Sequence, residues 1–280
     1  GGARADLFTY DIVDRTTQAH TTMASRALMP RASILFGPFS DVTLSASYGQ
    51  GFRALDPVLA GAEARGVPFS LIDAYEGGAS YALSSKSVAV QAKSMFFVTR
   101  VDRDLAFNEN TGRSGVTSGS TRTGWMGALR ATGSFFDTSA NVTMVKATYD
   151  ESHELVPYVP RFVVRDDTVF FENLPLSIDG DRVRGSAGAG ITYVGPRVLP
   201  EGARSDDVFT LDASLGASWR WAEVTLSGTN LLDSRYRLGE YNYASNFHTT
   251  PQPVTTPVRH FNAGAPRAVF LSLALTWGGG

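Results

Sequence analysis

Hydrophobic and polar residues alternate along most of the chain, and the alternation is clearest near its C-terminus. Phe209 to Trp221 places apolar side chains at every second position, with Thr, Asp, Ser, Gly and Arg between them. Val224 to Leu226 and Val269 to Trp277 alternate in the same way. A period of two marks a β-strand whose faces lie in different environments. A run of about thirteen residues exceeds the usual five or six of globular strands, so it predicts a wall between lipid and a polar lumen.

The same pattern predicts strands, or parts of strands, through most of the preceding chain. We expect these at 7–13, 32–37, 42–53, 72–83, 88–98, 121–131, 141–149, 161–171 and 183–193. Short connections are expected at about 38–41, 84–87, 136–139, 173–180 and 221–223. Long ones are expected at about 14–30, 53–70, 102–120, 150–160, 195–207 and 235–265. Strict alternation of short and long connections is typical of outer-membrane barrels, which have short periplasmic turns and long extracellular loops.

These eleven connections predict an all-β chain of twelve antiparallel strands in a transmembrane β-barrel. Composition agrees, because mean hydropathy is near neutral at -0.08, and polar lumen residues offset an apolar outer face in such barrels. The net charge of -2 argues against nucleic acid as a partner. The chain has no Cys, which excludes disulfides and thiolate metal sites. A soluble β-sheet binding domain is the alternative, and it predicts a chain that stays in solution without detergent.

Residues that could carry chemistry are scattered and lack the spacing of a known site. His20, His153, His248 and His260 all fall in predicted outer loops, where solvated histidine is commoner than a metal ligand. The acidic groups at 102–104, 150–151 and 179–181 lack the full register of a calcium loop, so we expect solvated charge. Catalytic motifs such as Gly-x-Ser-x-Gly do not occur. We therefore expect no enzyme, no bound cofactor and no resident metal.

The loop from Arg237 to Asn262 is the most distinctive candidate for ligand binding. Its aromatic and polar side chains suit an amphiphilic ligand. The candidates are Tyr241, Tyr243, Asn246, His248 and His260. The alternative is a structural loop packed over the barrel mouth. Separately, Trp219, Trp221 and Trp277 fall on the short-turn side and are interpreted as an aromatic girdle at the membrane interface.

Four segments together resemble the C-terminal barrel portion of TonB-dependent outer-membrane receptors. Ser47-Tyr48-Gly49-Gln50-Gly51-Phe52-Arg53 with Pro57 is similar to the family's Ser-Tyr-Gly-x-Gly-Phe-Arg-x-Pro segment, although Pro57 stands further on than usual. Asp73 to Gly78 resembles its Tyr-Glu-x-Gly strand, and Thr229 to Tyr236 resembles its Asn-Leu-Leu-Asp-x-x-Tyr signature. Gly264 to Arg267 resembles its Gly-x-Pro-Arg entry into the last strand. The four occur in the family's order over about 230 residues.

The resemblance implies a barrel of about 22 strands with a plug domain inside it, in the outer membrane of a Gram-negative bacterium. Residues 1–280 would then supply about the last twelve strands. A companion chain or segment would carry the remaining strands and the plug through which TonB acts. The glycines that flank the chain, Gly1-Gly2 and Gly278 to Gly280, indicate a split, cleaved or engineered chain.

Two functions follow from that resemblance. The first is uptake of a scarce small-molecule ligand, such as a siderophore or another metal chelate, with this chain forming wall and ligand-capture loops. The alternative is a structural barrel component of an outer-membrane assembly that does not transport. A plug with a TonB-binding segment on the companion distinguishes the two.

Overall fold

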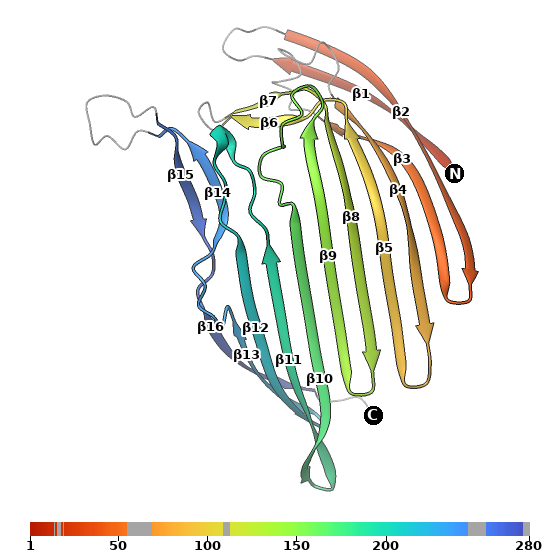
Figure 1. Ribbon diagram of the computed structural model, residues 1–280, viewed down its shortest axis with the longest axis vertical. Helices are drawn as coiled ribbons and strands as arrows, with labels where there is room; N and C mark the ends of the chain where they lie inside the picture. Colours follow the sequence, from red (N-terminus) through yellow and green to blue (C-terminus); the bar gives the residue numbers. More distant parts are fainter. Residues whose placement is uncertain are drawn as a thin grey trace.

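The chain forms one large antiparallel sheet, which runs through nearly all of Figure 1. The computed structural model describes residues 1–13, 15, 18, 20–54, 69–108, 113–245 and 256–276. The sheet has twelve strands in the order β1–β2–β3–β4–β5–β8–β9–β10–β11–β12–β13–β16. Their bounds are β1 Gly2–Val13, β2 His20–Phe39, β3 Val42–Ala54, β4 Phe69–Ser84, β5 Val88–Val101, β8 Ser120–Gly133, β9 Phe136–Tyr149, β10 Phe162–Ile178, β11 Asp181–Val194, β12 Val208–Trp219, β13 Ala222–Thr229 and β16 Ala268–Leu275.

Three smaller elements lie in the long connections. β6 (Leu105–Asn108) pairs with β7 (Arg113–Val116), and β14 (Arg237–Tyr243) pairs with β15 (Val258–Ala263). A short 3-10 helix, η1, spans Pro200–Gly202. Within the described ranges, no helix is long and apolar enough to cross a membrane.

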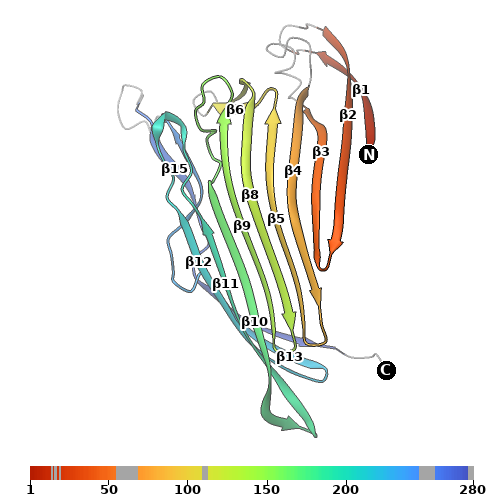
Figure 2. The same ribbon diagram turned by 45° about the vertical axis from the view of Figure 1, so that its right-hand side comes forward.

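The sheet is a curved, open wall with its short turns at one end and its long connections at the other (Figures 1 and 2). Each strand pairs with its neighbours in the sheet, and the described part of β1 does not pair with β16. The predicted twelve antiparallel strands and the sorting of short and long connections are therefore confirmed. The described strands form an arc of barrel wall that is not closed.

Register sorts the side chains of the sheet onto two chemically different faces. Leu215 in β12 pairs with Leu226 in β13, which pairs with Leu271 in β16. Directly opposed residues in an antiparallel pair share a face, so these leucines form one apolar row. The neighbouring Ser214 pairs with Ser227 on the other face. Leu215 is 61% exposed and Leu271 75% exposed, so the chain itself does not cover this apolar face.

The same division holds at the other side of the wall. Leu129 in β8 pairs with Ala92 in β5, which pairs with Tyr81 in β4. One position along, Lys93 pairs with Ser80 on the opposite face. The apolar face therefore continues from strand to strand, as expected for a wall that meets lipid on one side. The polar face is the lumen side of the arc.

Three of the predicted short turns lie elsewhere than expected. The turn predicted over 221–223 is formed by Arg220 and Trp221, because Ala222 already pairs with Trp219. The turn predicted over 136–139 lies at Ser134 and Phe135, because Phe136 already pairs with Phe170 in β10. The turn predicted over 173–180 shrinks to Asp179-Gly180, since β10 continues to Ile178 across a register shift between Asn173 and Ser177. Asp179 and Gly180 have φ of 47° and 84°. Positive φ at both central residues suits the tightest hairpin turns, and Asp-Gly readily adopts it.

The long connections contain more regular structure than the sequence predicted. β2 begins at His20, inside the predicted loop 14–30, and β1 pairs with it along its whole length from Gly2 to Val13. The predicted loops 102–120 and 235–265 contain the β6/β7 and β14/β15 pairs. In β14 the apolar period is missing because its buried positions, Glu240 and Asn242, are polar. The first strand is longer than the predicted 7–13, because β1 spans the twelve residues Gly2–Val13.

A small aromatic core joins the start of the wall near its long-loop end. The rings of Phe8 and Phe52 meet edge to face with centroids 4.7 Å apart, and Phe8 lies 5.4 Å from Phe69. Ala27 and Met29 of β2 complete this buried cluster. It holds the upper part of the β1–β2 hairpin against β3 and β4.

Candidate ligand-binding rim

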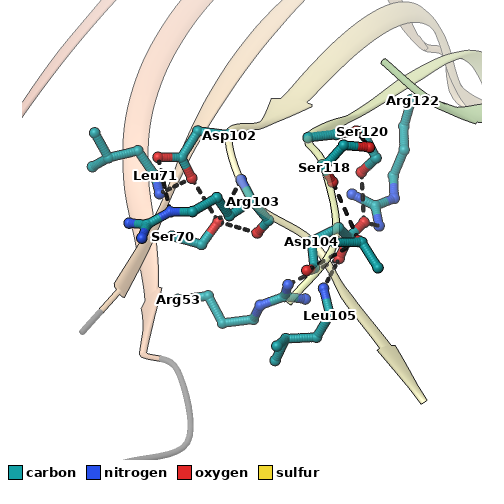
Figure 3. Close-up of polar contacts among 12 residues, drawn as sticks. Arg53, Ser70, Leu71, Asp102, Arg103, Asp104, Leu105, Ser118, Ser120 and Arg122 are labelled. Atoms are coloured by element: carbon teal, nitrogen blue, oxygen red, sulfur yellow. Dashed lines mark hydrogen bonds and ion pairs between the residues drawn. The ribbon is translucent and has the colours of Figure 1, made fainter. Parts of the chain in front are cut away.

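A buried carboxylate in the connection after β5 binds side chains of β3 and β8 at the long-loop end of the wall. We call Arg53, Asp104, Ser120 and Arg122 the Asp104 cluster (Figure 3). Asp104 is only 3% exposed. It accepts hydrogen bonds from Arg53 Nη2 at 2.9 Å, Arg122 Nη2 at 2.7 Å and Ser120 Oγ at 2.5 Å. The three donors come from β3 and β8, so the segment after β5 is held to strands on both sides.

The charge of Asp104 is stabilised by these partners. Burial of the carboxyl would by itself raise its pKa, but hydrogen bonds from Ser120, Arg53 and the Leu105 amide, with the charge of Arg122, lower the pKa below the ordinary value of 3.8. Asp104 lies between β5 and β6, beyond the spanning strands. The cluster is therefore ionised at neutral pH.

The neighbouring Asp102 fixes the start of β4 in a similar way. Its Oδ1 accepts hydrogen bonds from Ser70 Oγ and from the Leu71 amide, both at 2.8 Å (Figure 3). Arg103 Nη2 donates to the Phe69 carbonyl at 2.5 Å. The expectation of solvated charge at 102–104 is wrong for Asp104, whose oxygens are occupied by guanidinium and hydroxyl donors. Sequence could not show this, because the two arginines lie 51 and 18 positions away.

A second buried carboxylate anchors the β14/β15 pair. We call Asp206, Arg237, Glu240 and Arg259 the Glu240 cluster. Glu240 is 2% exposed, and its Oε2 lies 2.9 Å from Arg237 Nη1 and 3.4 Å from Arg259 Nη1. Its Oε1 accepts a hydrogen bond from the Asp206 amide at 2.8 Å. Both arginines also pair with the Asp206 carboxylate at 3.0 Å, so two acids and two bases balance.

Three of the five predicted ligand residues lie on this anchored pair. Tyr241 and Tyr243 stand two positions apart in β14, and Tyr241 pairs with His260 in β15. The ring of Tyr243 stacks on His260 with centroids 3.9 Å apart, and Ser245 Oγ lies 2.8 Å from His260 Nε2. Tyr241 is 37% exposed, and its ring lies 5.7 Å from that of Tyr158 in the loop after β9.

Of the remaining predicted residues, the structure describes Trp219 and Trp221. Asn246 and His248 fall outside the described residues. Trp219 and Trp221 sit beside the short β12–β13 turn, with ring centroids 5.7 Å apart. Trp219 Nε1 donates to the Ile178 carbonyl at 3.0 Å, and Trp221 is 49% exposed. Trp277 lies outside the described residues.

Of the other histidines, His20 and His153 do not join this site. His20 starts β2 and pairs with Asp11, so it belongs to a strand rather than to the predicted loop. His153 is exposed in the connection after β9, at a backbone φ of 57°. Within the described residues, no group of three or more His, Asp or Glu side chains is placed to hold a metal ion.

Sequence reasoning missed the residues that hold the rim in shape. The sequence marks Arg53 only as part of a motif, and no pattern in it marks Glu240. The one signal in the sequence for this cluster is the position of Arg53. It follows a long alternating strand, so it is expected at the edge of the membrane, where the strand enters water. Its partner Asp104 becomes identifiable only once the order of the strands is known.

Comparison with known protein families gives a match over most of the chain. The family model described as "TonB dependent receptor-like, beta-barrel" matches residues 1–231. No curated protein matches the chain by sequence.

Solved structures with the same wall are also found. The ferric-catecholate import receptor Fiu from E. coli K12 superposes with a TM-score of 0.66 at 15% identity, covering 92% of this chain and 36% of that one. The ferric yersiniabactin uptake receptor FyuA from Yersinia pestis gives 0.67 at 17% identity, with 91% and 38% covered. The siderophore receptor PiuA from Acinetobacter baumannii gives 0.69 at 14% identity, with 95% and 38% covered. The chain thus spans under two fifths of the length of these three receptors.

The family model agrees with the fold. The sheet has an apolar and a polar face, and its short and long connections alternate as in a membrane barrel. At these identities the solved structures establish the fold alone. The match over 231 of 280 residues establishes the family. The chain belongs to the TonB-dependent receptor-like β-barrel family.

Proposed function

We propose that residues 1–280 are the C-terminal portion of a TonB-dependent outer-membrane transporter, forming barrel wall and extracellular ligand-capture loops. The ligand is a scarce small molecule, and a metal chelate is the class we favour. The observation that carries the proposal is the anchored aromatic group on the β14/β15 pair at the long-loop end. The chain has no part in bond-making chemistry in this proposal.

The Glu240 cluster supports this role because it makes the aromatic group a fixed platform. A buried carboxylate bound by two arginines is costly to break, since loss of one partner leaves an uncompensated charge. Asp206 lies just before β12 and Glu240 lies in β14, so the cluster joins the β14/β15 pair to the wall. Tyr241 and Tyr243 are therefore presented at little further cost in conformational entropy.

The chemistry of the platform fits a planar or ring-bearing ligand with polar edges. Tyr241 presents a partly exposed ring and hydroxyl, while the stacked Tyr243 and His260 give a second flat surface. Tyr158 adds a third ring, with its hydroxyl buried and without a hydrogen-bond partner among the described residues. Rings with polar tips bind amphiphilic molecules by stacking and by hydrogen bonding.

The preference for a metal chelate comes from similarity. Three of the structurally similar proteins are described as a ferric-catecholate import receptor, a ferric yersiniabactin uptake receptor and a copper transporter. The polar inner face of the wall suits passage of such a hydrophilic cargo. The energy would come from TonB acting on a plug carried by the companion part of the barrel.

The test replaces Tyr241 and Tyr243 together by Ala in the intact receptor. Cells that depend on the receptor would be offered radiolabelled iron as catecholate and hydroxamate complexes, and copper as a chelate. We expect uptake of one of these probes to fall about tenfold, because stacking on two aromatic rings contributes roughly 0.5–1.5 kcal/mol each.

The matched control replaces both residues by Phe, which keeps the rings and removes the hydroxyls. Uptake preserved in the Phe variant and lost in the Ala variant supports a stacking platform. Unchanged uptake in the Ala variant at normal receptor levels would mean that the pair only covers the barrel mouth. Reduced receptor levels would assign the tyrosines to folding.

A further inference from the structure

One acidic side chain lies within the apolar face of the wall, and the uptake function does not use it. Asp166 in β10 pairs with Ala140 in β9 and with Ile191 in β11. Ala140 in turn pairs with Leu129, and Ile191 pairs with Leu211. Directly opposed residues share a face, so Asp166 belongs to this row of the apolar face. β10 itself runs through the middle of the wall, between β9 and β11 (Figure 1).

The depth of Asp166 follows from its neighbours in the row. Ala140 lies four residues from Phe136, where β9 begins, which is about 10 Å of height at a tilt of about 40°. Leu211 lies eight residues from Trp219, where β12 ends, which is about 20 Å of height at the same tilt. The strand of Asp166 lies between these two, so the side chain is near the middle of an apolar band about 25 Å tall.

Among the described wall strands from β8 to β16, Asp166 is the one charged side chain at this depth on the apolar face. The register places Lys146, Glu172 and Asp181 on the same face. Lys146 lies six positions beyond Ala140 towards the long-loop end, and the two acids lie towards the short-turn end. The ion pairs found in the described part of the chain do not include Asp166.

Two threonines satisfy part of the Asp166 carboxyl group. Thr168 Oγ1 donates to Asp166 Oδ2 at 3.1 Å, and Thr138 Oγ1 lies 2.6 Å from Thr168 Oγ1. Because the Thr168 hydroxyl already donates to Asp166, the Thr138 hydroxyl is the donor in the second bond. This hydrogen-bonded chain ends at the carboxyl group, and the described residues offer no donor to Oδ1.

The surface around the acid is made of small side chains. Thr168 pairs with Thr138 on one side and with Ala189 on the other, and Ala189 pairs with Ala213. These side chains stand lower than the leucines and aromatic residues elsewhere on this face. Small residues let two membrane proteins approach closely, so the side chain of a neighbouring protein can reach Asp166.

The unsatisfied carboxyl oxygen requires a donor at the same depth. Acyl chains carry no donor, and lipid headgroups lie about 12 Å away at the edges of the apolar band. A second copy turned about the membrane normal would bring its own Asp166 to this depth, which sets two acids against each other. Its Lys146 would stand about 15 Å higher.

The remaining source of a donor is a side chain of another membrane protein. Ionisable residues inside membranes are rare, pair with one another and mark functional contacts. We infer that the face formed by β9, β10 and β11 docks a different outer-membrane protein, whose wall presents a Lys or Arg side chain to Asp166. The inference needs this face to meet lipid, and it does not need the uptake function.

The experiment places the photo-crosslinking residue p-benzoylphenylalanine at Ile191 of the intact receptor in living cells. The same probe at Leu44 in β3 is the control position, because Leu44 is 45% exposed on the apolar face and lies far along the wall. Asp166→Asn removes the charge and keeps an acceptor for Thr168. Asp167→Asn is the matched control variant, because Asp167 pairs with Ser139 and Gly190 on the lumen face.

We expect the Ile191 probe to give one discrete protein adduct that the Leu44 probe does not give. Asp166→Asn should lower its yield about tenfold, while Asp167→Asn leaves it unchanged. Asp166→Lys should abolish the adduct, and an acidic residue in place of the facing Lys or Arg of the crosslinked protein should restore it. An adduct with a second copy of the receptor, an adduct with lipid alone, or a yield that Asp166→Asn does not change overturns the inference.

Stability of the purified receptor separates docking from a role in the fold. Without its partner, the Asp166→Asn receptor should be at least as stable as the wild type in guanidinium unfolding from lipid vesicles, since a charge has left the lipid. A less stable Asn variant would assign Asp166 to the fold and overturn the inference. Ligand uptake is not measured in either experiment, so the proposed transport function stands or falls separately.

Discussion

Leu215→Arg tests whether the apolar face of the wall meets lipid. Leu215 pairs with Ala187 in β11 and Leu226 in β13, while the adjacent Ser214 pairs with Gly188 and Ser227 on the lumen face. Four residues separate Leu215 from Trp219 at the short-turn end, which is about 14 Å along the strand. At a tilt of about 40°, that distance becomes about 10 Å of height in an apolar band about 25 Å tall. Leu215 therefore lies near the middle of the band.

The position sets the expected magnitude. Arg at the lipid-facing midplane of a barrel costs about 2–4 kcal/mol, which lowers the folded-to-unfolded ratio about 30- to 700-fold. Arg at Ser214 enters a polar lumen lined by Gly188 and Ser227, where a substitution changes stability by about 0.5 kcal/mol or less. The difference between the two neighbours is the quantity of interest, because both variants add the same side chain to the same strand.

The assay is guanidinium unfolding of the intact receptor in lipid vesicles, followed by tryptophan fluorescence. Ser214→Arg is the matched control. Equal losses of stability in the two variants, or a larger loss at Ser214, would refute the assignment of faces.

Three further predictions concern the rim and the wall. Asp104→Asn should loosen the β6/β7 pair by about 2–3 kcal/mol, because two partly exposed arginines lose their shared charge, and hydrogen exchange of that segment measures it. The pKa of Asp104 is lowered in the folded protein, so its contribution to stability is complete above pH 3.8 and is lost only as the pH falls through the lower folded-state pKa. Proteolysis of the β6/β7 segment should therefore rise in strong acid in the wild type but not in the Asn variant. Gly78→Ala should disturb the β4–β5 pairing, since a Cβ there would collide with the Ser94 carbonyl oxygen, whereas Gly77→Ala, whose Cβ has nothing nearer than 4.0 Å, should be tolerated in thermal unfolding.

Sequence alone determined the wall of this protein. The period of two is visible in the sequence of β12, β13 and β16 because one face of each strand meets lipid and the other meets water. The strand count follows from the same cause, as each return of the pattern marks another crossing. The family resemblance in Ser47 to Arg53 and Thr229 to Tyr236 falls where strands end and loops begin.

Tertiary structure decided what lies beyond the lipid. Where β14 and β15 pair, the buried positions of β14 are the polar Glu240 and Asn242, so no apolar period marks this strand in the sequence. Asp104 and Glu240 look like ordinary loop charges in sequence. They become buried anchors because strand register brings in Arg53, Arg122 and Arg259, while Arg237 lies three positions before Glu240 in the same strand. An ion pair between distant residues depends on the order and register of whole strands, and local pattern carries no record of either.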